Sequence, residues 1–203
     1  MTVKNIEQRV LIVIPAFNEE NNISNVVTDT RMKVPSADIV VIDDGSTDNT
    51  VMRALSAGAK VISLPINIGI GGAMQTGFKY AYERGYTVAV QIDGDGQHDP
   101  SEVDKLINPI FKGTSDIVKG SRYLEDTGYQ TPIFRRIGMI LFALITSFVL
   151  RQKITDTTSG FWAVNRKVLK VLSSNYPTDF PDADSLIYLG LLGFRISEAP
   201  VHM

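Results

Sequence analysis

Short runs of strand-forming residues alternate with stretches of helical periodicity through the first 120 residues. The predicted strands are Val10–Ile14, Asp38–Ile42, Val61–Leu64, Val88–Ile92 and Asp116–Val118. The predicted helices between them are Glu20–Met32, Thr47–Ala57, Gly72–Arg84 and Asp99–Ile110. Because each connection is long enough to hold a helix, we expect an α/β fold with a mostly parallel sheet covered on both faces.

The alternation loosens in the second part of the chain. An apolar stretch, Ile137–Leu150, directly follows Arg135 and Arg136. It is shorter than the roughly 20 residues that a spanning helix needs, so it is either a buried core helix or a helix at a membrane surface. Two further helical stretches and a strand at Phe194–Ala199 follow. We expect residues 1–203 to form a single domain.

Composition is that of a soluble globular protein, with 44% apolar and 21% charged residues. The formal net charge is −2, so the chain lacks the excess of basic residues that is typical of nucleic-acid-binding proteins. We therefore expect no nucleic-acid partner. Cysteine is absent, which excludes disulfides, thiolate metal sites and cysteine nucleophiles and suits a reducing compartment. The first residues lack the positively charged segment and the long apolar segment of a secretory signal. We therefore expect a cytoplasmic protein.

Acidic and polar residues follow three of the predicted strands, in "PAFNEE", "DDGSTD" and "DGDGQHD". Ligands of open α/β sheets bind beyond the carboxyl ends of the strands, so these segments are the expected site. The third segment holds three carboxylates, Asp93, Asp95 and Asp99. Asp99 precedes Pro100, the pattern of a helix N-cap followed by proline at the first helical position. We assign Asp99 that structural role.

Three chemistries could explain the remaining carboxylates. An EF-hand loop fits Asp93 and Asp95 but needs glycine where His98 stands. A haloacid-dehalogenase-like phosphatase would use Asp93 as nucleophile, but Gln97 stands where threonine normally follows, and three strands come first. The third is a divalent cation that holds a diphosphate, since hard oxygen ligands on a short loop suit Mg²⁺ or Mn²⁺. We interpret His98 as a supporting or stacking group.

Two other segments indicate nucleotide contacts. A carboxylate of Asp43 or Asp44 could accept hydrogen bonds from a nucleobase edge or ribose, while the serine and threonine after them suit a turn and cap. The glycine-rich "NIGIGGAMQTGFK" has Met74 where a dinucleotide fingerprint needs glycine, and it lacks the lysine of a phosphate-binding P-loop. Its backbone N–H groups could face a ligand, or its glycines could serve close packing.

Together, "VIPAFNEE", "VVIDDGSTD", "NIGIGGAMQTGF", "DGDGQHDP", "VKGSRY" and "TDTTSGFWAVNRK" resemble, in order, the family 2 glycosyltransferases of GT-A fold. The chain looks most like the branch of dolichol-phosphate mannosyltransferases and bacterial polyprenyl-phosphate glycosyltransferases. The resemblance implies a GT-A (Rossmann-like) fold, with residues 1–120 binding a GDP-, UDP- or dTDP-sugar and residues 121–203 facing the acceptor. It also implies inverting sugar transfer, to a polyprenyl phosphate in preference to a saccharide hydroxyl.

The resemblance carries roles onto individual residues. Those that would meet the nucleotide are Pro15, Ala16, Phe17, Asn18, Glu19, Asp43, Asp44, Asn67 and Gly71. Those that would meet Mg²⁺ or Mn²⁺ and the diphosphate are Asp93, Asp95 and Gln97. Relatives often carry Asp-Ala-Asp-Leu-Gln here, so Gly94 and Gly96 are departures that keep the oxygen ligands. Arg122 would face phosphate.

The acceptor side is implied by the second half of the chain. Arg135 and Arg136 would hold a lipid phosphate while the apolar helix contacts lipid, which predicts peripheral contact at the inner face of the cell membrane. Asp182 or Asp184 would act as general base for a hydroxyl acceptor, whereas a lipid phosphate needs none. Asp156 and Ser159 would shape this side, or form a structural turn.

Overall fold

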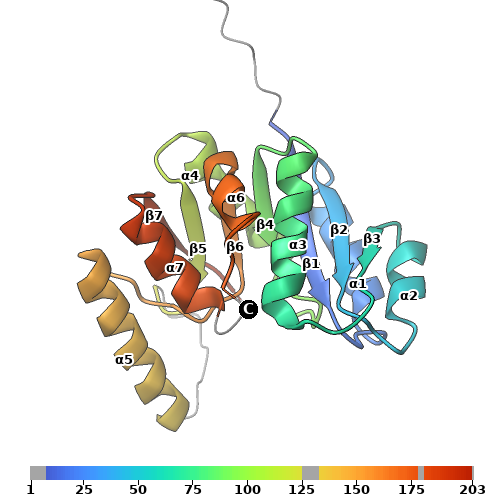
Figure 1. Cartoon of the computed structure of the whole chain (residues 1–203), viewed down its shortest axis with the longest axis horizontal. Helices are drawn as coiled ribbons and strands as arrows, with labels where there is room; N and C mark the ends of the chain where they lie inside the picture. Colours follow the sequence, from blue (N-terminus) through green and yellow to red (C-terminus); the bar gives the residue numbers. More distant parts are fainter. Residues whose placement is uncertain (1–7, 125–132, 178–180, 203) are drawn as a thin grey trace, which may run out of the picture.

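The computed structural model of the chain describes residues 8–124, 133–177 and 181–202, with side chains left undescribed at 133–140 and 181–183. Within these ranges, seven strands form one sheet in the order β3-β2-β1-β4-β6-β5-β7 (Figure 1). The strands are β1 (Val10–Ala16), β2 (Asp38–Asp43), β3 (Lys60–Ser63), β4 (Val88–Gln91), β5 (Ile117–Ser121), β6 (Trp162–Asn165) and β7 (Ile196–Pro200). The α-helices are α1 (Ile23–Lys33), α2 (Thr50–Ser56), α3 (Gly69–Glu83), α4 (Val103–Phe111), α5 (Ile133–Leu150), α6 (Arg166–Leu172) and α7 (Pro181–Leu191), with a 3₁₀ turn, η1 (Pro100–Glu102), before α4.

The sheet is parallel except at β6, which runs antiparallel between β4 and β5. Strand β1 pairs with β2 on one side and with β4 on the other. The chain leaves β1 toward β2 and β3, and it returns to β4 on the opposite side of β1. The strand order therefore reverses between β1 and β4, which is where open α/β sheets form their ligand crevice.

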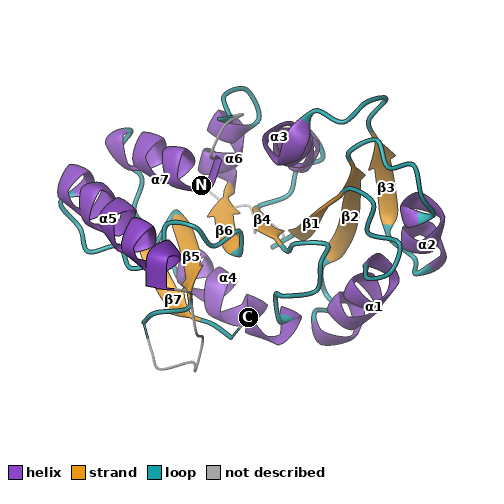
Figure 2. Cartoon of the chain, turned by 90° about the horizontal axis from the view of Figure 1, so that it is seen from below, coloured by secondary structure: helices purple, strands orange, loops and turns teal. Residues whose placement is uncertain are grey.

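Two layers of helices cover the sheet (Figure 2). Helices α1, α2 and α4 contribute buried residues to the core on one face, and α3, α6 and α7 to the core on the other. Along β1, Ile12 and Ile14 belong to the first core, and Leu11 and Val13 belong to the second. Both faces are thus buried, which explains why this strand is a continuous apolar run.

The predicted order of strands and helices over the first 120 residues is confirmed, with boundaries shifted by a few residues. Asp99 is confirmed as a helix N-cap: its side chain accepts a hydrogen bond from Ser101 N, and Pro100 occupies the first position of η1. Strand β6 was not predicted. It is four residues long and follows a polar turn, too short for a period-2 pattern to separate it from a helix.

Helix α5 lies at the outer side of the molecule beside α7 (Figures 1 and 2). Its described side chains include six exposed large apolar groups, here called the α5 apolar surface: Leu141, Phe142, Leu144, Ile145, Phe148 and Val149. The interpretation of this stretch as a buried core helix is therefore wrong for the described side chains. Within the described residues, no helix is long and apolar enough to cross a membrane.

Candidate functional site

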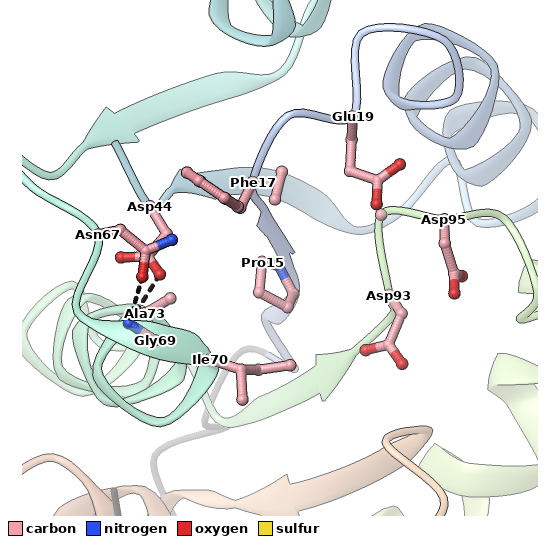
Figure 3. A pocket seen from close by; sticks show the side chains of 12 residues that line it. Pro15, Phe17, Glu19, Asp44, Asn67, Gly69, Ile70, Ala73, Asp93 and Asp95 are labelled. Carbon is pink, nitrogen blue, oxygen red and sulfur yellow. Dashed lines mark hydrogen bonds between the residues drawn. The ribbon is translucent and has the colours of Figure 1, made fainter. Parts of the chain in front are cut away.

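A cavity of about 320 Å³ lies beyond the carboxyl ends of β1, β2 and β4, where the strand order reverses (Figure 3). It is lined by Pro15, Ala16, Phe17, Glu19, Asp44, Asn67, Gly69, Ile70, Ala73, Asp93, Gly94 and Asp95. Eight of these residues were predicted from the sequence as site residues. The predicted residues Asn18, Asp43, Gly71 and Gln97 are not among its lining.

The loop after β1 is held in place by the loop after β2. Asn18, with a positive φ of 56°, donates its backbone N–H to Ser46 Oγ at 2.9 Å and accepts from Thr47 N at 2.9 Å. Glu19 N donates to Thr50 Oγ1 at 2.8 Å. The serine and threonines of "DGSTDNT" thus fix the neighbouring loop as well as their own turn. Asn18 serves as a link between the loops, which explains why it does not line the cavity.

Asp44 connects the end of β2 with the start of α3. Its two carboxylate oxygens accept hydrogen bonds from Ile68 N at 2.8 Å and Gly69 N at 2.9 Å. Gly69 has φ of +82°, a conformation that favours glycine, and α3 begins there. A carboxylate at a helix N-terminus is also stabilised by the helix dipole. Asp43 instead accepts from Ser46 N within its own turn, so Asp44 is the acid of the pair that faces the cavity.

The glycine-rich segment serves two purposes. The N–H of Gly69 faces Asp44 at the cavity, as described above. Further along α3, a Cβ added at Gly77 would lie 2.3 Å from Val13 Cγ1, so this glycine permits close packing of α3 on β1. Gly71 is buried within α3. The interpretation of close packing is therefore confirmed at Gly77, and contact of the segment's N–H groups with a ligand stays a prediction.

The lining residues separate into two polar ends. Figure 3 shows Asp44 and Asn67 on one side of the cavity and Asp93 and Asp95 on the other, with Pro15 between them. The side chains of Phe17 and Ile70 are 46% and 49% exposed, so apolar surface is accessible in the same cavity. A ligand that fits this arrangement has polar groups at both ends.

Asp93 is held by neighbours on both carboxylate oxygens. Gln91 Nε2 donates to Asp93 Oδ1 at 2.9 Å, and His98 Nε2 lies 3.6 Å from Asp93 Oδ2. The His98 ring stacks on Phe161, with ring centroids 4.9 Å apart, which confirms its predicted stacking role. Burial lowers the pKa of His98 below its usual value, although the charges of Asp93 and Asp95 act in the opposite direction.

Asp95 and Gln97 lie on the exposed part of the same loop. Asp95 accepts hydrogen bonds from Gln97 N at 3.0 Å and from Gln97 Nε2 at 2.9 Å. Gln97 therefore turns its amide nitrogen toward Asp95, and its role as a metal ligand stays a prediction. A Cβ on Gly94 would lie 2.9 Å from Pro15 O, so the departure from alanine here allows the loops after β1 and β4 to pack closely.

The carboxylates at the Asp93 and Asp95 end of the cavity suit a cation that is also coordinated by a bound ligand. Within the described ranges, no group of three or more histidine, aspartate or glutamate side chains is arranged to hold a metal ion. Mg²⁺ and its substitutes are commonly held by one or two carboxylates together with substrate phosphates and water. Asp93 and Asp95 line one end of an accessible cavity and supply such a pair.

Arg122, predicted to face phosphate, is bound to Asp156. Its Nε donates to Asp156 Oδ2 at 2.8 Å and its Nη2 to Asp156 Oδ1 at 3.0 Å. Burial raises the pKa of the Asp156 carboxyl, but the hydrogen bonds and charge of Arg122, together with the charge of Lys119, lower it below its usual value. Glu198 of β7 accepts the backbone N–H groups of Thr155 and Asp156 at 2.9 Å. Arg122 therefore holds the side chain of Asp156, and Glu198 holds its backbone.

The remaining acceptor-side predictions are only partly described. Asp184 is exposed in the first turn of α7 and does not line the cavity. Ser159 is buried, and its Oγ accepts a hydrogen bond from Phe161 N at 3.2 Å. The side chains of Arg135, Arg136 and Asp182 lie outside the described residues. Their proposed contacts with an acceptor stay predictions.

Some residues of the site were missed by sequence reasoning. Ile70 and Ala73 line the cavity from the first turns of α3. Gln91 is buried against Asp93, and Gly160 lies against the same carboxylate. Gln91 carries a signal in the sequence, since it is a polar residue within the apolar strand "VAVQI". Gly160 lies in the motif "TDTTSGFWAVNRK", but its contact with Asp93 could not be predicted because it depends on β6.

Comparison with known proteins identifies the family of the chain. Residues 11–173 match the family described as "Glycosyl transferase family 2". The chain is 35% identical over 185 residues to UDP-N-acetylglucosamine--dolichyl-phosphate N-acetylglucosaminyltransferase of Methanococcus voltae, covering 82% of this chain and 73% of the relative. It is 34% identical over 210 residues to polyprenol monophosphomannose synthase of Mycolicibacterium smegmatis, covering 96% of this chain and 77% of the relative.

A solved structure shares the fold. Glucosyl-3-phosphoglycerate synthase of Mycobacterium tuberculosis, in complex with Mn²⁺, UDP and glucosyl-3-phosphoglycerate, superposes with a TM-score of 0.72 and 23% identity, covering 97% of this chain and 72% of the other. The fold is thus the α/β GT-A fold. The chain belongs to glycosyl transferase family 2, and it is a glycosyltransferase.

Proposed function

We propose that the protein transfers a sugar, with inversion, from a nucleoside diphosphate sugar to a polyprenyl phosphate. The observation that carries this proposal is the cavity at the β1/β4 crevice, with Asp44 at one end and Asp93 and Asp95 at the other. The two relatives described above are named for transfer to dolichyl phosphate and for synthesis of a polyprenol monophosphomannose, which supports the lipid-phosphate acceptor.

The nucleoside would occupy the end at Asp44 and Asn67. Asp44 already binds two backbone N–H groups, so its remaining lone pairs would accept hydrogen bonds from a base or ribose. Phe17 and Ile70 supply exposed apolar surface for the flat face of a base. The diphosphate would then extend toward Asp93 and Asp95, and the donor is a GDP-, UDP- or dTDP-sugar.

The charge of the cavity supports dependence on a divalent cation. Among the described residues, its lining includes the carboxylates of Glu19, Asp44, Asp93 and Asp95 and no lysine or arginine. An anionic diphosphate placed beside these groups is repelled unless a cation lies between them. Asp93 and Asp95 would hold Mg²⁺ or Mn²⁺, with Gln97 as a third ligand if its amide rotates. The Mn²⁺ and UDP of the solved relative support this assignment.

The chemistry would follow from positioning and electrostatics. Bound Mg²⁺ or Mn²⁺ supplies charge that stabilises the departing diphosphate. The acceptor oxygen must lie in line behind the anomeric carbon, opposite the leaving group. A polyprenyl phosphate is already anionic and needs no general base. Asp182 or Asp184 would be needed as a base only for a saccharide hydroxyl.

The acceptor would be delivered from a membrane surface. The α5 apolar surface presents six exposed apolar side chains, and the first turn of the same helix, which begins at Ile133, includes Arg135 and Arg136 in its sequence. Apolar groups beside cationic groups suit the boundary between acyl chains and anionic headgroups. We place the enzyme on the cytoplasmic side, in peripheral contact with the inner face of the cell membrane.

A donor screen tests this proposal. Purified protein is incubated with UDP-, GDP- and dTDP-sugars and Mn²⁺ or Mg²⁺, with undecaprenyl phosphate, dolichyl phosphate or a soluble saccharide as acceptor. We expect one donor to give a glycosylated lipid phosphate, and chelation of the metal to abolish the product. Equal transfer to the saccharide would contradict the lipid-phosphate assignment. Release of free phosphate from phosphoesters would favour the phosphatase chemistry instead.

A further inference from the structure

The segment Gly160–Phe161–Trp162 lies against the Asp93 loop. A Cβ added at Gly160 would lie 2.8 Å from Asp93 Oδ2 and 2.9 Å from Gln91 Nε2. Phe161 carries the stacked ring of His98, and Trp162 contacts Gln91. The motif "SGFW" thus packs on the residues that hold the first carboxylate of the cavity.

The orientation of the Gln91 amide is fixed by Trp162. The indole Nε1–H donates to Gln91 Oε1 at 2.9 Å, and indole nitrogen can only donate. The amide oxygen therefore faces Trp162, and the amide nitrogen faces Asp93 Oδ1 at 2.9 Å. Gln91 is 2% exposed, so water does not compete for these contacts.

The tautomer of His98 is fixed by the backbone. Asp93 N–H donates to His98 Nδ1 at 3.0 Å, and a backbone N–H can only donate. The proton of a neutral His98 ring is therefore on Nε2, which lies 3.6 Å from Asp93 Oδ2. Stacking on Phe161 keeps the ring in this plane. Asp93 is thus faced by one N–H group on each oxygen.

We propose that Gln91 and His98 are positioning residues that orient the Asp93 carboxylate, and that the Gly160–Trp162 segment holds both of them in place. This inference rests on the proposed function, in which Asp93 is a cation ligand. Each oxygen keeps lone pairs that these contacts do not use, and Asp93 lines the cavity. Hydrogen-bonded supports of this kind typically change metal affinity or activity by about 10- to 100-fold when they are removed.

Two variants remove the supports while preserving packing. His98→Phe keeps a ring to stack on Phe161 but has no ring nitrogen. Gln91→Met combined with Trp162→Phe removes both partners of a buried hydrogen bond, which costs less stability than removing one. Affinity for Mn²⁺ in the presence of UDP, GDP and dTDP in turn is measured from the electron paramagnetic resonance signal of free Mn²⁺. We expect each variant to weaken Mn²⁺ binding about 10- to 100-fold.

A double-mutant cycle separates positioning from a general packing defect. In an Asp93→Asn background the carboxylate is already lost, so His98→Phe should weaken Mn²⁺ binding no further. An additive loss in that background would overturn the inference. His98→Asn supplies an amide oxygen for the Asp93 N–H and should recover part of the affinity that His98→Phe loses.

The ring of His98 offers a readout that needs no ligand. The chain has two histidines, so His202→Gln assigns the resonances of His98 in a ¹⁵N–¹H spectrum. We expect a single tautomer with the proton on Nε2; a proton on Nδ1 or a mixture would overturn the inference.

Unchanged Mn²⁺ affinity in both packing-preserving variants refutes only the positioning. A wild-type protein that binds Mn²⁺ with none of UDP, GDP and dTDP refutes the proposed metal site instead.

Discussion

Arg122 and Asp156 form a bidentate ion pair in which the Asp156 side chain is fully buried and the Arg122 side chain is 10% exposed. The pair joins the end of β5 to the turn before β6. Arginine matches a carboxylate with two parallel N–H groups, so the pair fixes direction as well as distance. It holds the turn whose later residues support Asp93.

Removing the carboxylate of this pair should destabilise the protein strongly. Asp156→Asn removes the charge that Asp156 supplies to the largely buried Arg122 guanidinium, and breaking a buried ion pair typically costs about 3 to 5 kcal/mol. Urea unfolding measures the loss. Asp29→Asn, which breaks an exposed pair with Lys33, is the control and should change stability little. Equal effects of the two substitutions would show that the buried pair has no special role.

Asp44 and Asp43 should differ in their effect on nucleotide binding. Asp44→Asn places an amide NH₂ against the N–H of Ile68 or Gly69, which disturbs the loop at the cavity. Because hydrogen bonds to charged groups contribute about 1.5–3 kcal/mol, we expect nucleotide affinity to fall about 10-fold or more. Asp43→Asn keeps an oxygen for Ser46 N and should have a smaller effect. Calorimetric titration with UDP and GDP compares them, and a larger loss for Asp43→Asn would contradict the assignment.

Alanine substitution at two buried glycines should affect Mn²⁺ binding and stability differently. At Gly160 the added Cβ meets the ends of the Asp93 and Gln91 side chains, which must shift to make room, so Gly160→Ala should weaken Mn²⁺ binding. At Gly77 it meets the branched side chain of Val13 in the core, so Gly77→Ala should cost about 1 to 3 kcal/mol of stability and leave Mn²⁺ binding unchanged. Thermal unfolding and Mn²⁺ titration of both variants test this contrast. A Gly160→Ala protein with wild-type Mn²⁺ affinity would argue against it.

The α5 apolar surface should be needed for lipid contact and not for folding. Phe148 is 85% exposed, so Phe148→Ser should change stability by no more than about 0.5 kcal/mol. It should nevertheless reduce sedimentation with anionic phospholipid vesicles and activity on long-chain acceptors. Met52→Ser, at an apolar residue of α2 that is 69% exposed, is the control and should bind vesicles normally. Equal vesicle binding by the two variants would contradict a membrane role for α5.

The sequence predicts the first half of the fold well because its signal is local. Each strand there is a buried run followed by a polar turn, and both faces of β1 are covered, so the apolar run is continuous. The prediction was weaker in the second half. Strand β6 is only four residues long and pairs with strands distant in the sequence, so tertiary contacts decide its conformation.

The same division between local signals and tertiary contacts applies to the candidate site. Asp44, Asp93 and Asp95 could be named because they stand at strand ends, and parallel strands bring their carboxyl ends to one edge of the sheet. The choice between Asp43 and Asp44 could not be made, because it depends on which side chain reaches the N–H groups before α3. The partner of Arg122 could not be named either, since Asp156 approaches it only after β6 has formed.

The most direct test of the central claim follows a radiolabelled sugar from its nucleotide to undecaprenyl phosphate. Wild-type protein is incubated with Mn²⁺, the lipid phosphate and the donor that the screen identifies, and the organic phase is counted. The account predicts label in the lipid fraction, loss of that label in Asp95→Ala and with EDTA, and an inverted anomeric configuration in the product. Label that appears only in a soluble saccharide, or transfer that is unaffected by EDTA and by Asp95→Ala, would contradict it.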